Sequence, residues 1–480
     1  LYGIREKFDE HYVESNHGVD KDEIQLLNRE GALVGDASHF VESHQIITSI
    51  STSTPNFVEV LSGRFDLDNY IDYFIFETYI QNRDWMGIDW GINNVKLWRQ
   101  DTAGGTWRYM MYDTDFAFGL YGGNIYDNYI ERARNPNYPN THSEIFDHAL
   151  DNADFKCRFT NRYNDLINTT FQTGNFNAVT DELKTELAPA IPDHIAQWSS
   201  QMGPYSYTYW LNAVNSIKSY NSGRIATARQ HLNQSLSLQG QHTVDLDAFP
   251  NAAGHIKLNS IMPELPWGGV YHGACPVTAQ AIPSRGFLFS HWYSTATAYN
   301  NVMQDSIVVA VAANTTLVAH FDTCKNVVDA TIQLSEKMLK AAVSIAVTNP
   351  SYEWLYNGTP VSTDSVIYNP LDGNYQLTVR FDSCEIQSDT FIVNQGDYGI
   401  HLFPNPAVDA LTVQFLMGQQ ENMTLGIYNT AGQLVWETTY SQFLGQLNTT
   451  IDVSTFARDL YMLRITTPSL TYARKFIVVD

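Results

Sequence analysis

The sequence predicts a multidomain protein in which an amino-terminal α+β domain is followed by all-β modules. Its 480 residues are too many for one hydrophobic core. Helical spacing of apolar residues dominates up to about residue 240, whereas short alternating runs separated by Gly, Pro, Asn and Ser dominate after it. An apolar content of 44%, with 13% aromatic residues, allows each part to form its own core.

The clearest local pattern lies within residues 68–119. Residues 68–83 carry apolar side chains at helical spacing behind an Asp-Asn start signal, which predicts a buried helix. Residues 94–100 and 107–113 are rich in aromatic and branched residues, and turn-forming residues 101–105 lie between them. The pattern therefore predicts a helix that leads into a β-hairpin with acidic residues at both ends.

The polar residues around this hairpin are of the kind that holds Mg²⁺ against phosphates. Asn94 and Asp113 are the candidate metal ligands, and Asp115 is a second ligand or its neighbour. Asp113 follows an apolar strand, where we expect a buried carboxylate that needs a cation as its partner. The general base is Asp84, directly after the helix, or Asp89, at the spacing to Asn94 found in the protein-kinase catalytic loop. Otherwise these residues are turn formers and helix caps.

The charge balance limits the possible partners. A formal net charge of −23, from 51 acidic and 28 basic residues, argues against nucleic acid and against an anionic membrane surface. An anionic nucleotide would need a metal ion and local basic residues, for which Lys96, Arg99 and Arg108 are candidates. Their alternative role is ordinary charge on the face of a hairpin. No glycine-rich loop of the GxxxxGK type occurs in the sequence.

The same segment resembles a known family, the CotH-type (spore coat protein H) kinases. The resemblance rests on NNVKLWR at 93–99 and WRYMMYDTDFAFG at 107–119, and it extends to YGIREKFD at 2–9, PDHIAQW at 192–198 and the helical stretch at 224–237. It covers roughly residues 1–240. The resemblance implies an atypical kinase fold and a secreted enzyme that uses ATP and Mg²⁺ or Mn²⁺ to phosphorylate Ser or Thr of surface or secreted proteins.

Carried over residue by residue, the resemblance makes Asp113 the metal-binding Asp and Asn94 the metal-binding amide. The base falls on Asp84 when aligned from the preceding helix and on Asp89 when aligned from Asn94, because several extra residues separate the two segments. The chain opens inside what should be the amino-terminal lobe. We therefore expect an incomplete kinase domain over 1–240, with a nucleotide-contacting Lys upstream of Leu1.

Three β-modules are expected after the kinase-like domain. Residues 241–322 resemble a small β-repeat module, and residues 323–396, with a central Trp354, resemble an immunoglobulin-like sandwich despite a helix-like pattern at 337–345. Residues 399–480 resemble the type IX secretion C-terminal sorting domain of Bacteroidetes and read as about seven strands. That resemblance implies export across the outer membrane by the type IX machinery to the cell surface or medium.

The cysteines show no zinc-binding spacing, and no apolar run is long enough to span a membrane. Cys324 and Cys384 each follow a strand end and could pair in an exported protein, although free buried thiols are equally compatible with the pattern. Two other functions remain open. One is a pseudokinase or surface-assembly protein, and the other is a glycan- or protein-binding surface protein that acts through its β-modules.

Overall fold

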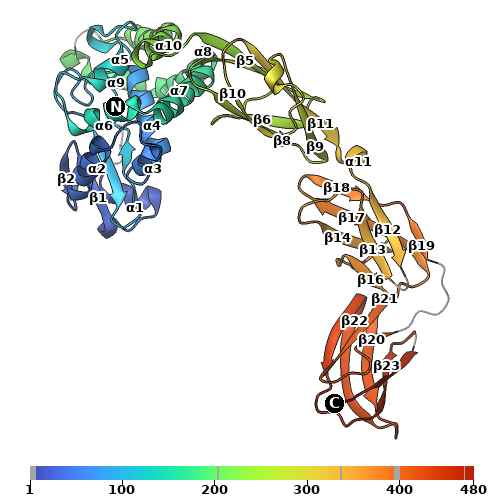
Figure 1. The fold of residues 1–480 in the computed structure, drawn as a ribbon. Helices are drawn as coiled ribbons and strands as arrows, with labels where there is room; N and C mark the ends of the chain where they lie inside the picture. The colour runs from blue at the N-terminus through green and yellow to red at the C-terminus, as the bar shows by residue number, and fades with distance from the viewer. Residues whose placement is uncertain (1–6, 203–204, 336–337, 394–399, 470) are drawn as a thin grey trace. The chain divides into compact units, whose positions relative to one another are not determined.

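The computed structural model describes residues 7–202, 205–335, 338–393, 400–469 and 471–480. The chain forms two compact units, the first made of Leu1–Asp247, Ile256–Ala281 and Trp292–Ala319, the second of Ala248–His255, Ile282–His291 and His320–Asp480. Helices and one small sheet occupy the first part of the chain, and β-strands dominate the rest (Figure 1). The predicted α+β region followed by β-rich modules is confirmed.

Four short antiparallel strands form the sheet of the α+β region, in the order β2-β1-β3-β4. They are β1 (Ile24–Asn28), β2 (Gly31–Val34), β3 (Lys96–Gln100) and β4 (Arg108–Met110). The predicted hairpin is thus confirmed, with Leu97 opposite Tyr109 in its two strands. It is shorter than predicted, because β4 ends at Met110. The stretch at 2–9, which carries part of the family resemblance, lies largely outside the described residues.

The predicted helix at 68–83 is confirmed as α4 (Leu67–Ile80), which is buried on nearly every face. Asp66 begins it by accepting a hydrogen bond from the backbone N–H of Asn69. Other helices and 3₁₀ turns of this region are α1 (Glu10–His17), η1 (Lys21–Glu23), α2 (Ser38–Ser49), α3 (Phe57–Ser62), η2 (Leu120–Gly122), α5 (Tyr129–Arg134), α6 (Thr141–Asp151), α7 (Ala153–Asn168), α8 (Thr173–Leu187), η3 (Ala188–Ala190), α9 (Ile191–Met202) and α10 (Tyr207–Leu236).

Aromatic packing joins α4 to the hairpin. The ring of Tyr73 stacks on that of Tyr109 from β4, with a centroid distance of 4.5 Å, and Phe74 stacks on Phe146 from α6 at 4.3 Å. Trp85, just beyond α4, is fully buried in the same core. Because each ring buries a large apolar area, this packing fixes the end of α4 relative to the hairpin.

A buried arginine from α10 binds the carboxyl end of α4. Arg224 donates from Nε to the backbone O of Tyr79 at 2.8 Å and from Nη2 to the backbone O of Thr78 at 3.1 Å. The last carbonyl groups of a helix have no partner within the helix, so this guanidinium satisfies acceptors that burial would otherwise leave unpaired. The chain then turns at Gln81, whose φ is +57°.

The strands after α10 form two sheets, in the orders β7-β5-β11-β9 and β10-β8-β6. These strands and their 3₁₀ turn are β5 (Gln241–Phe249), β6 (Gly254–Leu258), β7 (Trp267–His272), β8 (Val277–Pro283), β9 (Phe287–Ser294), η4 (Thr297–Tyr299), β10 (Ser306–Val309) and β11 (Thr315–Thr323). Trp292 is buried, as expected for a core residue, and donates from Nε1 to the backbone O of Gln304 at 3.0 Å.

Within the first unit, α7 is bound tightly to this β-module. The buried carboxylate of Asp165 accepts hydrogen bonds from the hydroxyls of Tyr271 at 2.7 Å and Ser260 at 2.6 Å. Burial raises the pKa of Asp165, and these hydrogen bonds offset part of that rise. A disulfide between Cys157 and Cys275 adds a covalent link that the sequence pattern did not indicate.

The next module holds a sheet of order β12-β13-β16 and a second of order β15-β14-β17-β18, with β19 paired to β17. The short helix and the strands are α11 (Cys324–Val327), β12 (Ala330–Ser335), β13 (Met338–Val343), β14 (Ser351–Tyr356), β15 (Thr359–Ser362), β16 (Val366–Tyr368), β17 (Gly373–Phe381), β18 (Cys384–Gln387) and β19 (Phe391–Val393). Residue 337 of the helix-like pattern at 337–345 lies outside the described residues, and most of the rest is strand β13, because pairing on both sides overrides local propensity. Trp354 is buried, and the disulfide Cys324–Cys384 is present.

The last module is one sheet of order β20-β21-β23-β24, with β22 paired to β21. Its strands are β20 (His401–Phe403), β21 (Ala410–Tyr428), β22 (Leu434–Asp452), β23 (Leu460–Thr466) and β24 (Thr471–Ile477). The expectation of about seven strands is wrong for the described residues, because β21 and β22 each continue for 19 residues through register irregularities. Gly432 lies in the turn between them with φ +77°.

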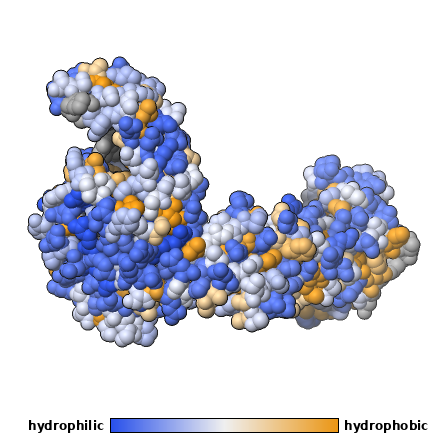
Figure 2. Space-filling model, turned by 90° about the horizontal axis from the view of Figure 1, so that it is seen from above, coloured by the Kyte–Doolittle hydropathy of each residue, from blue (hydrophilic) through white to orange (hydrophobic). Residues whose placement is uncertain are grey.

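The surface seen in one view is largely hydrophilic. Figure 2 shows a face on which hydrophilic residues predominate and hydrophobic residues form small groups. Among the described helices, none combines the length and the apolar character needed to span a membrane.

Replacing Cys157 and Cys275 with Ser should destabilise the first unit. The disulfide closes a loop across 118 residues, so its loss should lower the free energy of unfolding by about 4 kcal/mol, chiefly by releasing chain entropy in the unfolded state. Urea unfolding of the full chain, followed by tryptophan fluorescence, measures this change. The double variant Cys324→Ser/Cys384→Ser is the matched control, and it should leave the unfolding of the first unit unchanged. Equal stability of the Cys157/Cys275 variant and the parent would contradict the expectation.

Candidate functional site

The candidate site is built around the carboxylate of Asp84, four residues beyond the end of α4. Asn93 donates from Nδ2 to Oδ1 of Asp84 at 2.6 Å. Asn94 donates from Nδ2 to Oδ2 of Asp84 at 3.2 Å and to its backbone O at 2.9 Å. Two neighbouring amides therefore fix the direction of this carboxylate, at the point where the chain enters β3.

Asn94 also contacts the segment that follows β4, since its Nδ2 lies 3.4 Å from the backbone O of Asp113. Asn94 and Asp113 both have positive φ, +52° and +57°, a conformation that non-glycine residues rarely adopt. Such backbone strain concentrates at functional sites, where the surrounding structure maintains it. The structure thus brings together three of the sequence-predicted residues, Asp84, Asn94 and Asp113.

The prediction that Asp113 is a buried carboxylate is wrong, because the side chains of both Asp113 and Asp115 are exposed. The reason is that β4 ends at Met110, so that the chain has left the sheet before it reaches either residue. Their carboxylates are accessible from solvent, which is what binding a cation together with a substrate requires.

Tyr73 supports the arrangement from the core and was missed in the sequence. Its hydroxyl accepts a hydrogen bond from Nε1 of Trp85 at 2.8 Å and lies 3.4 Å from the backbone O of Asn94. Arg29 holds the neighbouring amide by donating from Nη2 to Oδ1 of Asn93 at 2.8 Å. The helical spacing around Tyr73 marked it only as a core residue, because its polar contact comes from a segment 21 residues away.

Asp89, the other candidate base, is held in ion pairs. Its Oδ2 accepts from Nε of Arg83 at 2.9 Å, and its Oδ1 accepts from Nη2 of Arg132. Its side chain is only 14% exposed. The structure does not bring Asp89 to the amides that hold Asp84, and its two oxygens are already engaged by guanidinium groups.

Two of the predicted basic residues, Lys96 and Arg108, lie in different parts of the hairpin. Lys96 donates to the backbone O of Phe8 at 3.1 Å and lies 4.8 Å from the ring centroid of Tyr112, while burial, followed by the charge of Lys7, lowers the pKa of Lys96. Arg108 begins β4 at the end of the hairpin opposite Asp113 and donates to Oδ2 of Asp66 at 2.9 Å.

Arg99, the third basic candidate, is held by hydrogen bonds inside the fold. It is buried and donates from Nη1 to Gln25 at 2.9 Å and from Nη2 to the backbone O of Thr102 at 2.7 Å. Of the three basic candidates, only Lys96 contacts Tyr112, the residue that precedes Asp113. Whether Lys96 or Arg108 contacts a nucleotide stays a prediction.

Charged groups at this end of the hairpin shift the pKa of Tyr112. Burial raises the pKa of Tyr112, and the negative charges of Asp113 and Asp84 raise it further, while Arg29 lowers it. Both carboxylates therefore act on the same phenol, which agrees with their convergence around Asn94.

The donor set fits a hard cation in chemical type. Asn94, Asp113 and Asp115 offer amide and carboxylate oxygens, the ligands that Mg²⁺ prefers. Within the described part of the chain, no three His, Cys, Asp or Glu side chains gather closely enough to form a metal site alone. Mg²⁺ is commonly held by one or two carboxylates plus the phosphates of a nucleotide, so the residues present fit a metal that arrives with its nucleotide.

A buried carboxyl group lies behind the site and was also missed in the sequence. Glu77 on α4 is fully buried, and neither of its carboxyl oxygens has a hydrogen-bond partner of normal geometry among the described residues. Burial raises its pKa to about 8, and the side chain of Asn82 offsets a smaller part of the rise. Asn82 in turn accepts a hydrogen bond at Oδ1 from the backbone N–H of Asp84 at 3.2 Å. The signal available in the sequence was a charged residue within the largely apolar run 73–80 at the carboxyl end of α4.

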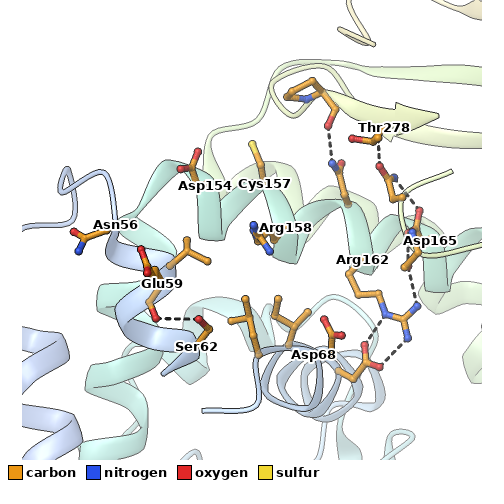
Figure 3. Close-up of a pocket in the computed structure, with 18 of the residues that line it drawn as sticks. Asn56, Glu59, Ser62, Asp68, Asp154, Cys157, Arg158, Arg162, Asp165 and Thr278 are labelled. Carbon is orange, nitrogen blue, oxygen red and sulfur yellow. Dashed lines mark hydrogen bonds and ion pairs between the residues drawn. The ribbon is translucent and has the colours of Figure 1, made fainter. Parts of the chain in front are cut away.

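A cavity of about 1290 Å³ lies elsewhere in the first unit, between α3, α4, α7 and the loops before β7 and β8. Figure 3 shows Glu59, Asp68, Asp154 and Arg158 around its opening. On its wall, Arg162 binds Asp72 through two hydrogen bonds. None of the sequence-predicted site residues lines this cavity, so the candidate chemistry is confined to the end of the hairpin.

Two family matches agree with the sequence analysis. Residues 1–227 match the family described as CotH kinase protein, and residues 401–479 match the family described as Secretion system C-terminal sorting domain. Both resemblances drawn from the sequence are therefore confirmed. The sorting domain marks the protein for export to the cell surface or the medium.

No curated protein matches the chain. Three solved structures resemble parts of it at 10% identity. They are the Bacillus anthracis TIE protein (TM-score 0.13, over 50% of this chain and 48% of that chain), a biofilm-associated protein BSP domain (0.16, 51% and 57%) and the N-terminal eight Ig domains of Down Syndrome Cell Adhesion Molecule (0.14, 50% and 39%). The chain spans about half the length of the first two, and TM-scores this low carry no further conclusion.

Glu77→Gln should flatten the dependence of stability on pH. Because the pKa of Glu77 rises from 4.5 to about 8 on folding, the folded protein keeps a proton between these pH values that the unfolded chain has released. The free energy of unfolding therefore falls as pH rises through this window, by up to about 1.4 kcal/mol per pH unit. The neutral amide of Gln removes this contribution. Urea unfolding at pH 5 and pH 8 measures it.

The matched control is Glu186→Gln, on the exposed surface of α8. This variant should keep the parent's difference between the two pH values. An unchanged difference in Glu77→Gln would mean that Glu77 is ionised in the folded protein.

Proposed function

We propose that this protein, which carries a CotH kinase family domain and a secretion sorting domain, is an exported kinase that transfers the γ-phosphate of ATP to Ser or Thr of surface or secreted proteins. The observation that carries the proposal is the convergence of Asp84, Asn94 and Asp113 at one end of the hairpin. An oriented carboxylate beside an amide and an exposed acid is the set of groups that phosphoryl transfer needs.

Asp84 is the base in this proposal. It orients the acceptor hydroxyl and takes its proton, while the amides of Asn93 and Asn94 keep the carboxylate directed. Asp89 has a different task, since its ion pairs to Arg83 and Arg132 hold the loop between Asp84 and Asn93 in place. Guanidinium groups on both of its oxygens would oppose protonation during catalysis.

Asn94, Asp113 and Asp115 would hold the metal ion. When bound, Mg²⁺ supplies charge neutralisation on the phosphate oxygens of ATP. Lys96, whose ammonium group lies over Tyr112, is the nearest basic candidate for the phosphates, and Arg108 stays a weaker candidate at the far end of the hairpin. Mn²⁺ could replace Mg²⁺, because both accept oxygen ligands.

The rest of the chain serves display in this proposal. The β-rich region between the kinase domain and the sorting domain comprises a small module over 241–322 and an immunoglobulin-like sandwich over 323–396. A buried Trp354 and the disulfide Cys324–Cys384 support the sandwich. The type IX secretion machinery would recognise the final module, residues 399–480.

Replacing Asp84 with Asn should abolish phosphoryl transfer, whereas Asp89→Asn should reduce it only through loosening of the loop. Loss of a general base typically costs 10²- to 10⁴-fold in rate. Asp113→Ala should be at least as severe, because it removes a proposed metal ligand. Transfer of labelled γ-phosphate by the full chain to casein or to itself, with Mg²⁺ or Mn²⁺, measures all three.

Circular dichroism and thermal unfolding of each variant separate lost chemistry from lost folding. Full activity in Asp84→Asn together with inactive, folded Asp89→Asn would transfer the role of base to Asp89. No transfer by the parent protein and no nucleotide binding would instead identify a pseudokinase.

Metal binding should depend on the nucleotide. Because no three acidic side chains form a site among the described residues, Mg²⁺ alone should bind weakly, and ATP should increase its affinity by at least tenfold. Calorimetric titration with MgCl₂, with and without a non-hydrolysable ATP analogue, measures both. Asp113→Ala should remove the increase while leaving the fold intact. Tight Mg²⁺ binding without nucleotide would contradict the proposed ligand set.

A further inference from the structure

The loop of residues 85–92, between Asp84 and Asn93, is held rigidly. The backbone N–H of Met86 donates to the O of Asn93 at 3.1 Å, and the backbone O of Gly87 accepts from the N–H of Tyr138 at 3.0 Å. Gly87 has φ +81°, and a Cβ there would lie 2.4 Å from the O of Tyr138. Trp85, Met86 and Ile88 are buried, so the first half of the loop belongs to the core.

The end of this rigid loop exposes a large aromatic side chain. Trp90 is 46% exposed, although the first residues of the loop are buried. Its ring meets that of Phe116 edge to face at a centroid distance of 5.4 Å, and Phe116 lies 5.1 Å from the ring of Tyr121, which is 70% exposed. We call Trp90, Phe116 and Tyr121 the aromatic platform.

Arg83 joins the two segments that carry the platform. Its guanidinium lies 5.2 Å from the ring centroid of Trp90, and its Nη1 donates to the backbone O of Tyr121 at 2.7 Å. Its backbone N–H donates to the O of Phe116 at 3.1 Å. Together with the ion pair to Asp89, these contacts hold the exposed rings in one arrangement without covering them.

The platform lies beside the proposed base. The same Nδ2 atom of Asn93 donates to Oδ1 of Asp84 at 2.6 Å and to the backbone O of Trp90 at 2.9 Å. On the other segment, Phe116 directly follows Asp115. A group that reaches Asp84 therefore lies close to the backbone of the loop that carries Trp90.

A preformed, exposed aromatic group is well suited to binding. Trp and Tyr supply a large contact area at low entropic cost, and they are enriched among the residues that dominate binding energies at interfaces. The position of the rings indicates which ligand they bind. Trp90 belongs to the loop that begins at Asp84, and Asp84 is the group that the acceptor hydroxyl must contact.

We propose that the aromatic platform binds the acceptor protein, by taking an aromatic or large apolar side chain that flanks the phosphorylated Ser or Thr. This inference rests on the proposed function and specifies its substrate class. An extended peptide advances about 3.3 Å per residue, so a side chain one or two positions from the hydroxyl lies within about 7 Å of it along the chain. The extra residues between Asp84 and Asn93 would thus provide the selectivity of the kinase.

The test compares synthetic Ser peptides that carry one Phe at each of the two positions on either side of Ser with the same peptide carrying Ala. The full chain should bind and phosphorylate at least one Phe peptide with a Kd and KM about tenfold lower than the Ala peptide. Trp90→Ala should abolish this preference, so that the Phe and Ala peptides bind with similar Kd and are phosphorylated with similar KM. Trp90→Phe, which keeps a ring, should restore part of it.

Tyr293→Ala is the matched control, because it removes a ring of similar exposure, 48%, from the β-module. It should keep the preference. Peptide binding is followed by fluorescence anisotropy, which needs no catalysis, so a failure of phosphoryl transfer and a failure of the platform are distinguished. Equal binding of all peptides by the parent protein would overturn the proposal. A raised KM for ATP in Trp90→Ala, with the peptide preference intact, would assign the platform to the nucleotide instead.

Discussion

The carboxyl end of α4 is the constraint on which the candidate site depends. A buried helix cannot end without partners for its last carbonyl groups, and here the guanidinium of Arg224 supplies them. Because Arg224 comes from α10, more than 140 residues away, two distant parts of the chain must assemble before Asp84 has a defined position. The position of Asp84 therefore depends on the packing of the whole helical core.

The hairpin determines where Asp84 points. Asn93 and Asn94 precede β3, and Asp113 follows β4, so pairing of the two strands brings these residues to the same end of the sheet. Positive φ at Asn94 and Asp113 costs on the order of 1–3 kcal/mol each, and contacts such as that of Tyr73 oppose its relaxation. The site therefore combines a rigid support with a strained backbone at its reactive end.

The sequence predicts those features that depend on local periodicity. Helix α4 and the hairpin followed from apolar spacing and turn residues, and the two terminal families followed from their motifs. Features that depend on distant partners could not be predicted. Asp89 and Asp84 could not be distinguished as candidate bases from the sequence, because Asp89 pairs with Arg132, which lies 43 residues further along the chain. Likewise, the disulfide of Cys157 joins residues with no informative spacing.

Asp113 and Asp115, two of the proposed metal ligands, differ in exposure from charged residues of otherwise similar appearance. Arg99 is buried, and Asp89 and Arg162 are held in ion pairs within the fold, where an opposite charge offsets part of the cost of removing them from water. Asp113 and Asp115 remain accessible on a strained turn, although a chain with 51 acidic residues gains little stability from further exposed acids. Their accessibility leaves both carboxylates able to take the role of metal ligand that the proposal assigns to them.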